Sequence, residues 1–188
     1  MQNLQYALVA YVRQPVGEFV ENLRRELHPD LPDLPAHLTI LPPRCLAGVF
    51  PNRESSALET LEEMCREAEP FEITLGEVET FVPVTPTVFI RVVHAAHRMS
   101  ELHDRLNTGI LQSEEQWPYT PHFTVAKMAT EEHARQAFEV ARERWKEYSG
   151  SRRIAVEELT FVRGGENNSW EDLAALPLGR SLVSKNSR

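Results

Sequence analysis

Alternating apolar and polar positions predict short strands separated by amphipathic helices along the whole chain. An apolar, β-prone run at residues 5–12 predicts the first strand. A helix is expected from Pro15 to Leu27, because apolar residues recur there at helical spacing and proline is favoured in the first turn. The pattern then predicts a strand at 37–41 that is stopped by two prolines, a helix at 55–69 and a long strand at 71–82.

The same order of elements recurs in the second half of the chain. The expected elements are strands at 87–93, 122–126 and 153–162, helices at 97–111 and 130–148, and a further strand within 169–178. Thr130 is a suitable cap for the second of these helices. A short sequence supports the repeat, since Thr-Phe-Val at 80–82 returns as Thr-Phe-Val at 160–162.

This repeat indicates an internal duplication of a βαβ-type unit. No linker separates the halves, so residues 1–188 are expected to form one bilobal α+β domain. The lobes would be built from roughly residues 5–82 and 86–178, with or without exchange of strands between them. An approximate two-fold axis would relate the lobes, with antiparallel sheets around a central cleft and helices outside.

A four-residue motif occurs once in each half, as His-Leu-Thr-Ile at 37–40 and His-Phe-Thr-Val at 122–125. Alternate side chains of a strand point to the same face, so the histidine and threonine of each motif share a face and the apolar residues point into the core. The two-fold axis would bring both motifs together. Two imidazoles and two hydroxyls around one volume suit phosphodiester chemistry, in which one imidazole accepts a proton and the other donates one.

Composition narrows the classes of partner. The chain of 188 residues has a net charge of −8, which argues against coating long nucleic acid but permits a short RNA end or a small nucleotide in a locally basic cleft. It contains no run of 18 apolar residues and no export signal, so a cytoplasmic protein without membrane contact is expected. A monomer is favoured.

The two motifs resemble those of the two-histidine (2H) phosphoesterase superfamily, and within it the 2′-5′ RNA ligase-like group of cyclic phosphodiesterases. The resemblance implies that His37 and His122 form the catalytic pair, that Thr39 and Thr124 hold the phosphate, and that neither a metal nor another cofactor takes part. Many bacterial members carry a basic residue five positions after the second histidine, where this chain has Lys127.

Some polar and aromatic residues allow two interpretations. Arg44 is a candidate substrate-binding cation of the cleft or a surface charge. Trp117 and Tyr119 precede the second motif and either stack on a base or pack within their loop. His94, His97 and His103 are expected at the surface of a helix rather than in a metal site, because zinc usually takes four ligands.

The expected activity is metal-independent hydrolysis of 2′,3′-cyclic phosphodiesters in RNA ends or nucleotides, with 2′-5′ RNA ligation as the minor reverse reaction. The sequence leaves open which histidine is the base. The alternatives are a non-catalytic module that binds RNA ends or nucleotides, and a 2H enzyme that acts on another small cyclic phosphate. Turnover of a cyclic nucleotide separates the binding module from the enzymes.

Overall fold

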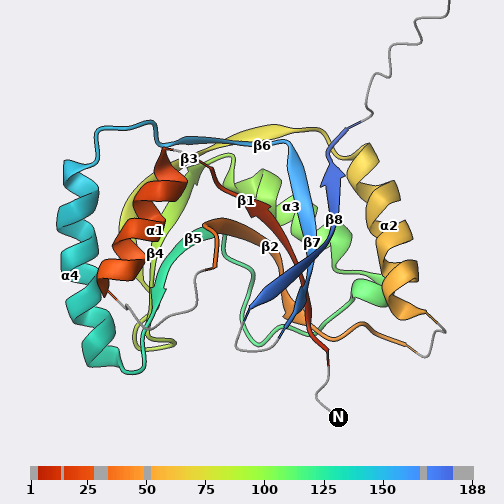
Figure 1. The fold of residues 1–188 in the computed structure, drawn as a ribbon, viewed down its shortest axis with the longest axis horizontal. Coiled ribbons are helices and arrows are strands. Elements are labelled where there is room, and N and C mark those ends of the chain that lie inside the picture. The colour runs from red at the N-terminus through yellow and green to blue at the C-terminus, as the bar shows by residue number, and fades with distance from the viewer. Residues whose placement is uncertain (1–3, 14, 28–33, 49–51, 166–168, 180–188) are drawn as a thin grey trace, which may run out of the picture.

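The computed structural model describes residues 4–13, 15–27, 34–48, 52–165 and 169–179. It has two four-stranded antiparallel sheets with α-helices packed outside them (Figure 1), which confirms the predicted α+β class. No helix in the described part of the chain is long and apolar enough to cross a membrane.

The elements follow the predicted order with small shifts at their ends, except that the helix expected at 97–111 ends at Leu106 and is followed by a separate 3₁₀ helix. They are β1 (Tyr6–Tyr11), α1 (Val16–Leu27), β2 (His37–Arg44), α2 (Arg53–Glu67), β3 (Phe71–Thr80), β4 (Thr87–His94), α3 (Ala96–Leu106), the 3₁₀ helix η1 (Gly109–Leu111), β5 (His122–Lys127), α4 (Glu131–Glu147), β6 (Arg153–Val156), β7 (Glu158–Gly164) and β8 (Trp170–Pro177).

The two sheets repeat one arrangement of strands. The first sheet has the order β2-β1-β7-β8 and the second has the order β5-β4-β3-β6. Strands β2, β1 and β7 therefore correspond to β5, β4 and β3. Strand β3 comes from the first half of the chain but lies in the second sheet, and β7 makes the reverse exchange. The sheets are thus not built from two continuous halves of the chain.

The bounds of two strands differ from those that the sequence predicts. The expected strand at 153–162 is divided at Glu157 into β6, which pairs with β3, and β7, which pairs with β1, because the chain passes from one sheet to the other there. Strand β2 continues through Pro42 and Pro43 to Arg44 instead of stopping. The prolines are tolerated because β2 is an edge strand, where a missing N–H costs little.

The helices cover the outer faces of the sheets and close the core. Helix α4 packs on β3, β4 and β5, and α1 lies beside it over β5, whereas α2 contacts β8 and α3 contacts β2 (Figure 1). The side chain of Trp145 in α4 is 1% exposed, and its Nε1 donates to the carbonyl of Gly76 at 2.8 Å. Thr130 caps α4 as predicted, since its hydroxyl accepts from the backbone N–H of His133.

Candidate active site

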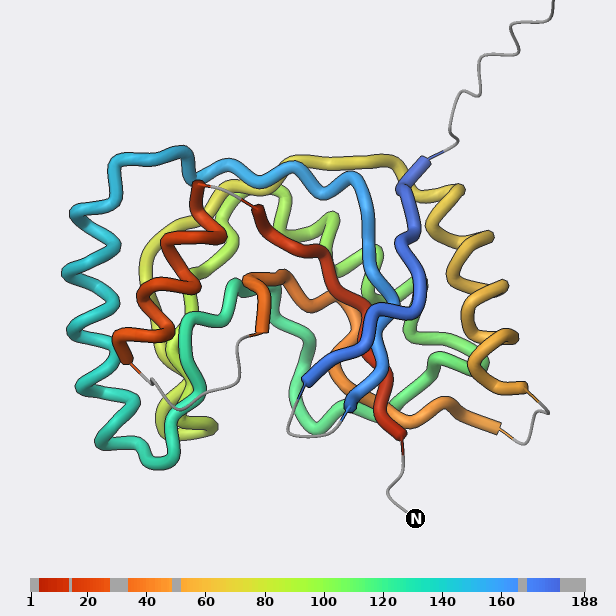
Figure 2. The backbone as a smooth tube through the Cα atoms, viewed as in Figure 1, coloured from red at the N-terminus to blue at the C-terminus, as the bar shows by residue number. Residues whose placement is uncertain are grey.

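The two motif strands lie side by side at the centre of the molecule. Strand β2 is at one edge of the first sheet, β5 is at one edge of the second, and these two edges are in contact (Figure 2). Exchange of β3 and β7 between the sheets joins the halves of the chain around this contact. The fold therefore brings together two motifs that are 85 residues apart in the sequence.

Each motif has the alternation that the sequence predicts. The apolar residues are fully buried in the core, with exposures of 0% for Leu38, Ile40, Phe123 and Val125. The intervening histidines and threonines are only half-buried. Within the described residues, the hydroxyls of Thr39 and Thr124 have no hydrogen-bond partner, so both remain available to a ligand.

Both imidazoles are held in the same way. The Nδ1 of His37 lies 2.7 Å from the carbonyl oxygen of Pro35, and the Nδ1 of His122 lies 2.6 Å from that of Thr120. A carbonyl can only accept, so Nδ1 must carry the proton that is donated in each contact. This fixes the tautomer of the neutral ring and leaves Nε2 of each histidine free to exchange a proton with a ligand.

Aromatic rings restrict both histidines further. The ring of His37 lies 4.6 Å from that of Trp170 in β8. The ring of His122 meets Phe81 edge-on at 5.1 Å and Phe89 at 5.3 Å. These contacts limit the rotation of the imidazoles and remove water from one side of each.

The environment favours neutral imidazoles. The pKa of His37 is lowered to about 4, mainly by burial. The positive charges of Arg24, Lys127 and His122 lower this pKa further, whereas the hydrogen bond to the carbonyl of Pro35 raises it. Burial also lowers the pKa of His122, with a further contribution from Lys127. Lys127 is exposed at the end of β5, the strand that begins with His122.

Helix α1 supplies two residues that connect the motifs, and sequence reasoning missed both. The guanidinium of Arg24 donates to the carbonyl of Leu34 at 2.8 Å and to the carbonyls of Thr124 and Val125 at 3.2 Å each. The carboxylate of Glu21 accepts from the backbone N–H of Ala36 at 2.8 Å. Arg24 thus binds the backbone of the second motif and the backbone of Leu34, which precedes the first motif. Nothing local in the sequence distinguishes it from other helix arginines.

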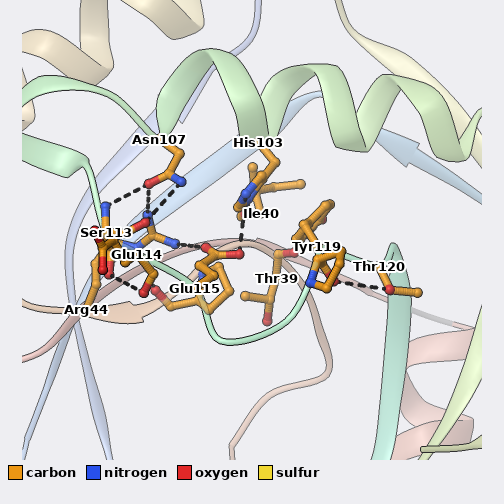
Figure 3. A network of polar contacts seen from close by, with 12 residues as sticks. Thr39, Ile40, Arg44, His103, Asn107, Ser113, Glu114, Glu115, Tyr119 and Thr120 are labelled. Atoms are coloured by element: carbon orange, nitrogen blue, oxygen red, sulfur yellow. Dashed lines mark hydrogen bonds and ion pairs between the residues drawn. The ribbon is translucent and has the colours of Figure 1, made fainter.

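The placement of Arg44 does not agree with a role in substrate binding. It is 4% exposed, and its Nη2 lies 2.6 Å from a carboxylate oxygen of Glu115 (Figure 3). Its Nη1 donates to Asn107 at 2.6 Å and to the carbonyl of Leu111 at 3.0 Å. The Nη donors of Arg44 therefore bind the segment between α3 and the second motif.

A second part of this network reaches the first motif. The Nδ1 of His103 lies 2.8 Å from the carbonyl of Ile40, and its ring stacks on Tyr119 at 4.1 Å (Figure 3). The hydroxyl of Tyr119 donates to the carbonyl of Thr39 at 2.7 Å. Tyr119 thus packs against α3 and β2 rather than within its own loop. His103 is buried, contrary to the expected surface position. Trp117 is 54% exposed.

The other predicted surface histidines, His94 and His97, are exposed. The described residues contain no group of three or more histidine, cysteine, aspartate or glutamate side chains placed to hold a metal ion.

Comparisons with known proteins agree with this geometry. The family model of the 2′-5′ RNA ligase superfamily matches residues 12–168. A relative from Oceanobacillus iheyensis, named "Putative phosphoesterase", is 29% identical over 127 residues, which are 66% of this chain and 71% of the relative.

Solved structures share the fold. The crystal structure of E. coli LigT complexed with NADP⁺ has a TM-score of 0.64 and 15% identity, covering 95% of this chain and 99% of LigT. LigT complexed with 3′-AMP has the same TM-score and identity, with coverages of 93% and 97%. The match of the family model to most of the chain, together with the two converging motifs, shows that this protein belongs to the 2′-5′ RNA ligase superfamily of two-histidine phosphoesterases.

Proposed function

We propose that this protein hydrolyses 2′,3′-cyclic phosphodiesters of RNA ends or nucleotides without a metal ion. One observation carries the proposal. Two imidazoles whose Nδ1 atoms are anchored in the same way stand on adjacent strands, and each lies beside a threonine hydroxyl that has no hydrogen-bond partner among the described residues. LigT binds 3′-AMP, a phosphomonoester of the kind that ring opening of a cyclic nucleotide yields. This supports the choice of substrate.

In this mechanism His37 is the base and His122 is the acid. Nε2 of His37 removes a proton from water while the water oxygen forms a bond to phosphorus. The bond from phosphorus to one ribose oxygen breaks, and the imidazolium of His122 donates its proton to that oxygen. The assignment rests on electrostatics, since the charges of Arg24 and Lys127 both lower the pKa of His37, whereas of these two only Lys127 lowers the pKa of His122.

The substrate itself completes the charge balance of the site. A bound cyclic phosphate is an anion, so its presence raises the pKa of both imidazoles and allows His122 to hold its proton at neutral pH. The hydroxyls of Thr39 and Thr124 donate to the non-bridging oxygens, and Lys127 adds a positive charge. Lysine acts here as a point charge rather than as a bidentate donor.

Hydrolysis of a 2′,3′-cyclic nucleotide, and of an oligoribonucleotide ending in one, tests the proposal with EDTA present. The His37→Ala and His122→Ala variants should each lose about 10²- to 10⁴-fold in kcat, the usual contribution of a general acid or base. His97→Ala is the matched control, because this histidine is exposed on α3 and should leave kcat unchanged. Activity that EDTA abolishes, or that both variants retain, would reject the proposal.

A further inference from the structure

Each motif strand has a β-bulge at the fourth residue of its motif. The pairing of β2 with β1 passes from Thr39 to Leu41 and skips Ile40. The pairing of β5 with β4 likewise passes over Val125, the residue after Thr124. A bulge disrupts the hydrogen-bond ladder locally and changes the direction of neighbouring side chains. The bulges therefore lie directly beside the two threonines whose hydroxyls the proposed function assigns to the phosphate.

Two side chains from the second half of the chain bind the backbone at the first bulge. The hydroxyl of Tyr119 donates to the carbonyl of Thr39 at 2.7 Å, and Nδ1 of His103 lies 2.8 Å from the carbonyl oxygen of Ile40 (Figure 3). The rings of Tyr119 and His103 stack 4.1 Å apart at an interplanar angle of 4°. His103 belongs to α3 and is 3% exposed, so the phenol ring lies on a buried support.

Arg24 of α1 binds the second bulge in the equivalent way. Its Nη2 donates to the carbonyl of Thr124 and its Nε to the carbonyl of Val125, at 3.2 Å each. Helix α1 follows β1 and packs on β5, and α3 follows β4 and packs on β2, so the two helices hold equivalent places in the repeat. Each threonine carbonyl is thus bound by a residue from the other half of the chain.

These contacts restrict the place of the threonine hydroxyls. The carbonyl and the side chain of a residue share one Cα, and a β-branched side chain has few rotamers, so fixing the carbonyl also restricts the hydroxyl. The hydroxyl of Thr39 has no hydrogen-bond partner within the described residues, so its backbone sets its position. The single proton of the Tyr119 hydroxyl is used in its bond to Thr39, and burial raises the pKa of that hydroxyl, so the tyrosine keeps the proton at neutral pH.

We infer that Tyr119 is a positioning residue for the hydrolysis that acts through Thr39, and that Arg24 acts in the same way through Thr124. The inference rests on the proposed function, which assigns both threonine hydroxyls to the non-bridging oxygens of the phosphate. A donor to a developing negative charge is effective when its place is set before the charge forms. Neither Tyr119 nor Arg24 needs to touch the substrate for this role.

Tyr119→Phe removes the hydroxyl and keeps a ring that can stack on His103. It should lower kcat for a 2′,3′-cyclic nucleotide by about 10- to 100-fold, because a misplacement of about 1 Å costs up to about 10²-fold. KM should change little, as expected when an interaction of the transition state is lost. Tyr148→Phe is the matched control and should leave kcat unchanged. The ring of Tyr148 stacks on Trp145 at 5.0 Å and its hydroxyl donates to the carbonyl of Ser151 at 3.1 Å, so these contacts involve neither motif.

Double-mutant cycles distinguish positioning from a general loss of structure. In Thr39→Val the hydroxyl is absent, so Tyr119→Phe should lower kcat no further, whereas in Thr124→Val it should keep its full effect. Arg24→Lys keeps the charge but lacks the bidentate geometry of the guanidinium, and most of its loss of kcat should disappear in Thr124→Val.

Either of two results would overturn the inference: an unchanged kcat in Tyr119→Phe, or the same fold loss in the Thr39→Val background as in the wild type. The second would show that Tyr119 supports the fold without acting through Thr39. Circular dichroism checks that each variant is folded. If Tyr119→Phe does not fold, the cycle of Arg24 and Thr124 decides the inference by the same criteria.

Binding separates a failure of this inference from a failure of the proposed function. If no cyclic phosphate is hydrolysed, the same cycle is measured by calorimetry with 3′-AMP. A loss of affinity in Tyr119→Phe that disappears in the Thr39→Val background would support the positioning role and reject only the hydrolysis. Equal affinities of wild type and Tyr119→Phe, or the same loss in both backgrounds, would reject the positioning role.

Discussion

Replacing Arg44 by methionine should destabilise the fold and leave the affinity for substrate unchanged. The sequence made this arginine a candidate for substrate binding, but the structure encloses it. Its guanidinium donates to Asn107, Glu115 and the carbonyls of Pro42 and Leu111, at 2.6 to 3.0 Å. Burial lowers the pKa of Arg44, and its bond to Glu115 opposes that shift. Methionine fills a similar volume but supplies none of these donors.

The size of the effect follows from the exposure of the ion pair. Removing one partner of a buried salt bridge costs about 3–5 kcal/mol, mainly because the other charge is left unpaired. The side chain of Glu115 is 19% exposed, so water can partly solvate it. We therefore expect the lower end, about 3 kcal/mol. In a domain of this size, that corresponds to a decrease in Tm of about 6–12 °C.

Urea unfolding followed by circular dichroism measures the loss, and KM for a cyclic nucleotide is measured well below the Tm. The double variant Arg44→Met with Glu115→Gln should recover part of the stability, because no unpaired carboxylate remains. Arg98→Met is a control for arginine removal, since its ion pair with Glu101 is at the surface and should contribute about 0–1 kcal/mol.

A different pattern would refute this reasoning. An increase in KM of about tenfold or more with an unchanged Tm would correspond to about 1.4 kcal/mol of lost binding. It would show that Arg44 contacts the substrate, as the sequence first suggested. An unchanged Tm and an unchanged KM would show that the buried network contributes no net stability.

Three further predictions concern the helices and His37. Thr130→Ala removes the cap of α4 and should lower the free energy of unfolding by about 1 kcal/mol in urea, whereas Thr130→Ser should keep it. Arg24→Gln removes a positive charge near His37 and should raise its pKa above about 4; an unchanged NMR titration of the ring would contradict this. Between pH 6.5 and 4 the unfolded chain takes up a proton that folded His37 does not, so stability should fall as the pH decreases through this window. Urea unfolding of wild type and His37→Gln across the window should show a steeper loss for the wild type; parallel curves would reject the shift.

Local patterns in the sequence were sufficient for the class of the fold and for the faces of the motif strands. Alternation alone placed Leu38 and Phe123 in the core and their neighbouring histidines on the opposite face, because the period of a strand is two wherever the strand lies. Recurrence of the same order of elements indicated a duplicated unit. The conclusion that the two motifs meet needed the symmetry of that duplication.

Contacts between distant segments decided the pairing of the strands and the side-chain contacts around the motifs. At Glu157 and Glu158 two successive exposed residues shift the buried apolar positions from Ile154 and Val156 to Leu159 and Phe161. This local break does not show that the chain changes sheets there, because pairing with β3 before it and with β1 after it depends on distant segments. Arg24 reaches β5 across about 100 residues, and Trp170 reaches His37 from the last strand.

The sequence by itself therefore determined the two histidine motifs, the orientation of their side chains and the elements that carry them. Only the tertiary structure decided the environment of those side chains: which carbonyls fix the imidazoles, which charges lower their pKa, and which candidates lie elsewhere. The physical reason is that strand and helix periodicity depends on neighbouring residues, whereas burial and electrostatics depend on groups that approach only after folding. Arg44 illustrates the difference, because a basic residue near a motif became a buried partner of Glu115.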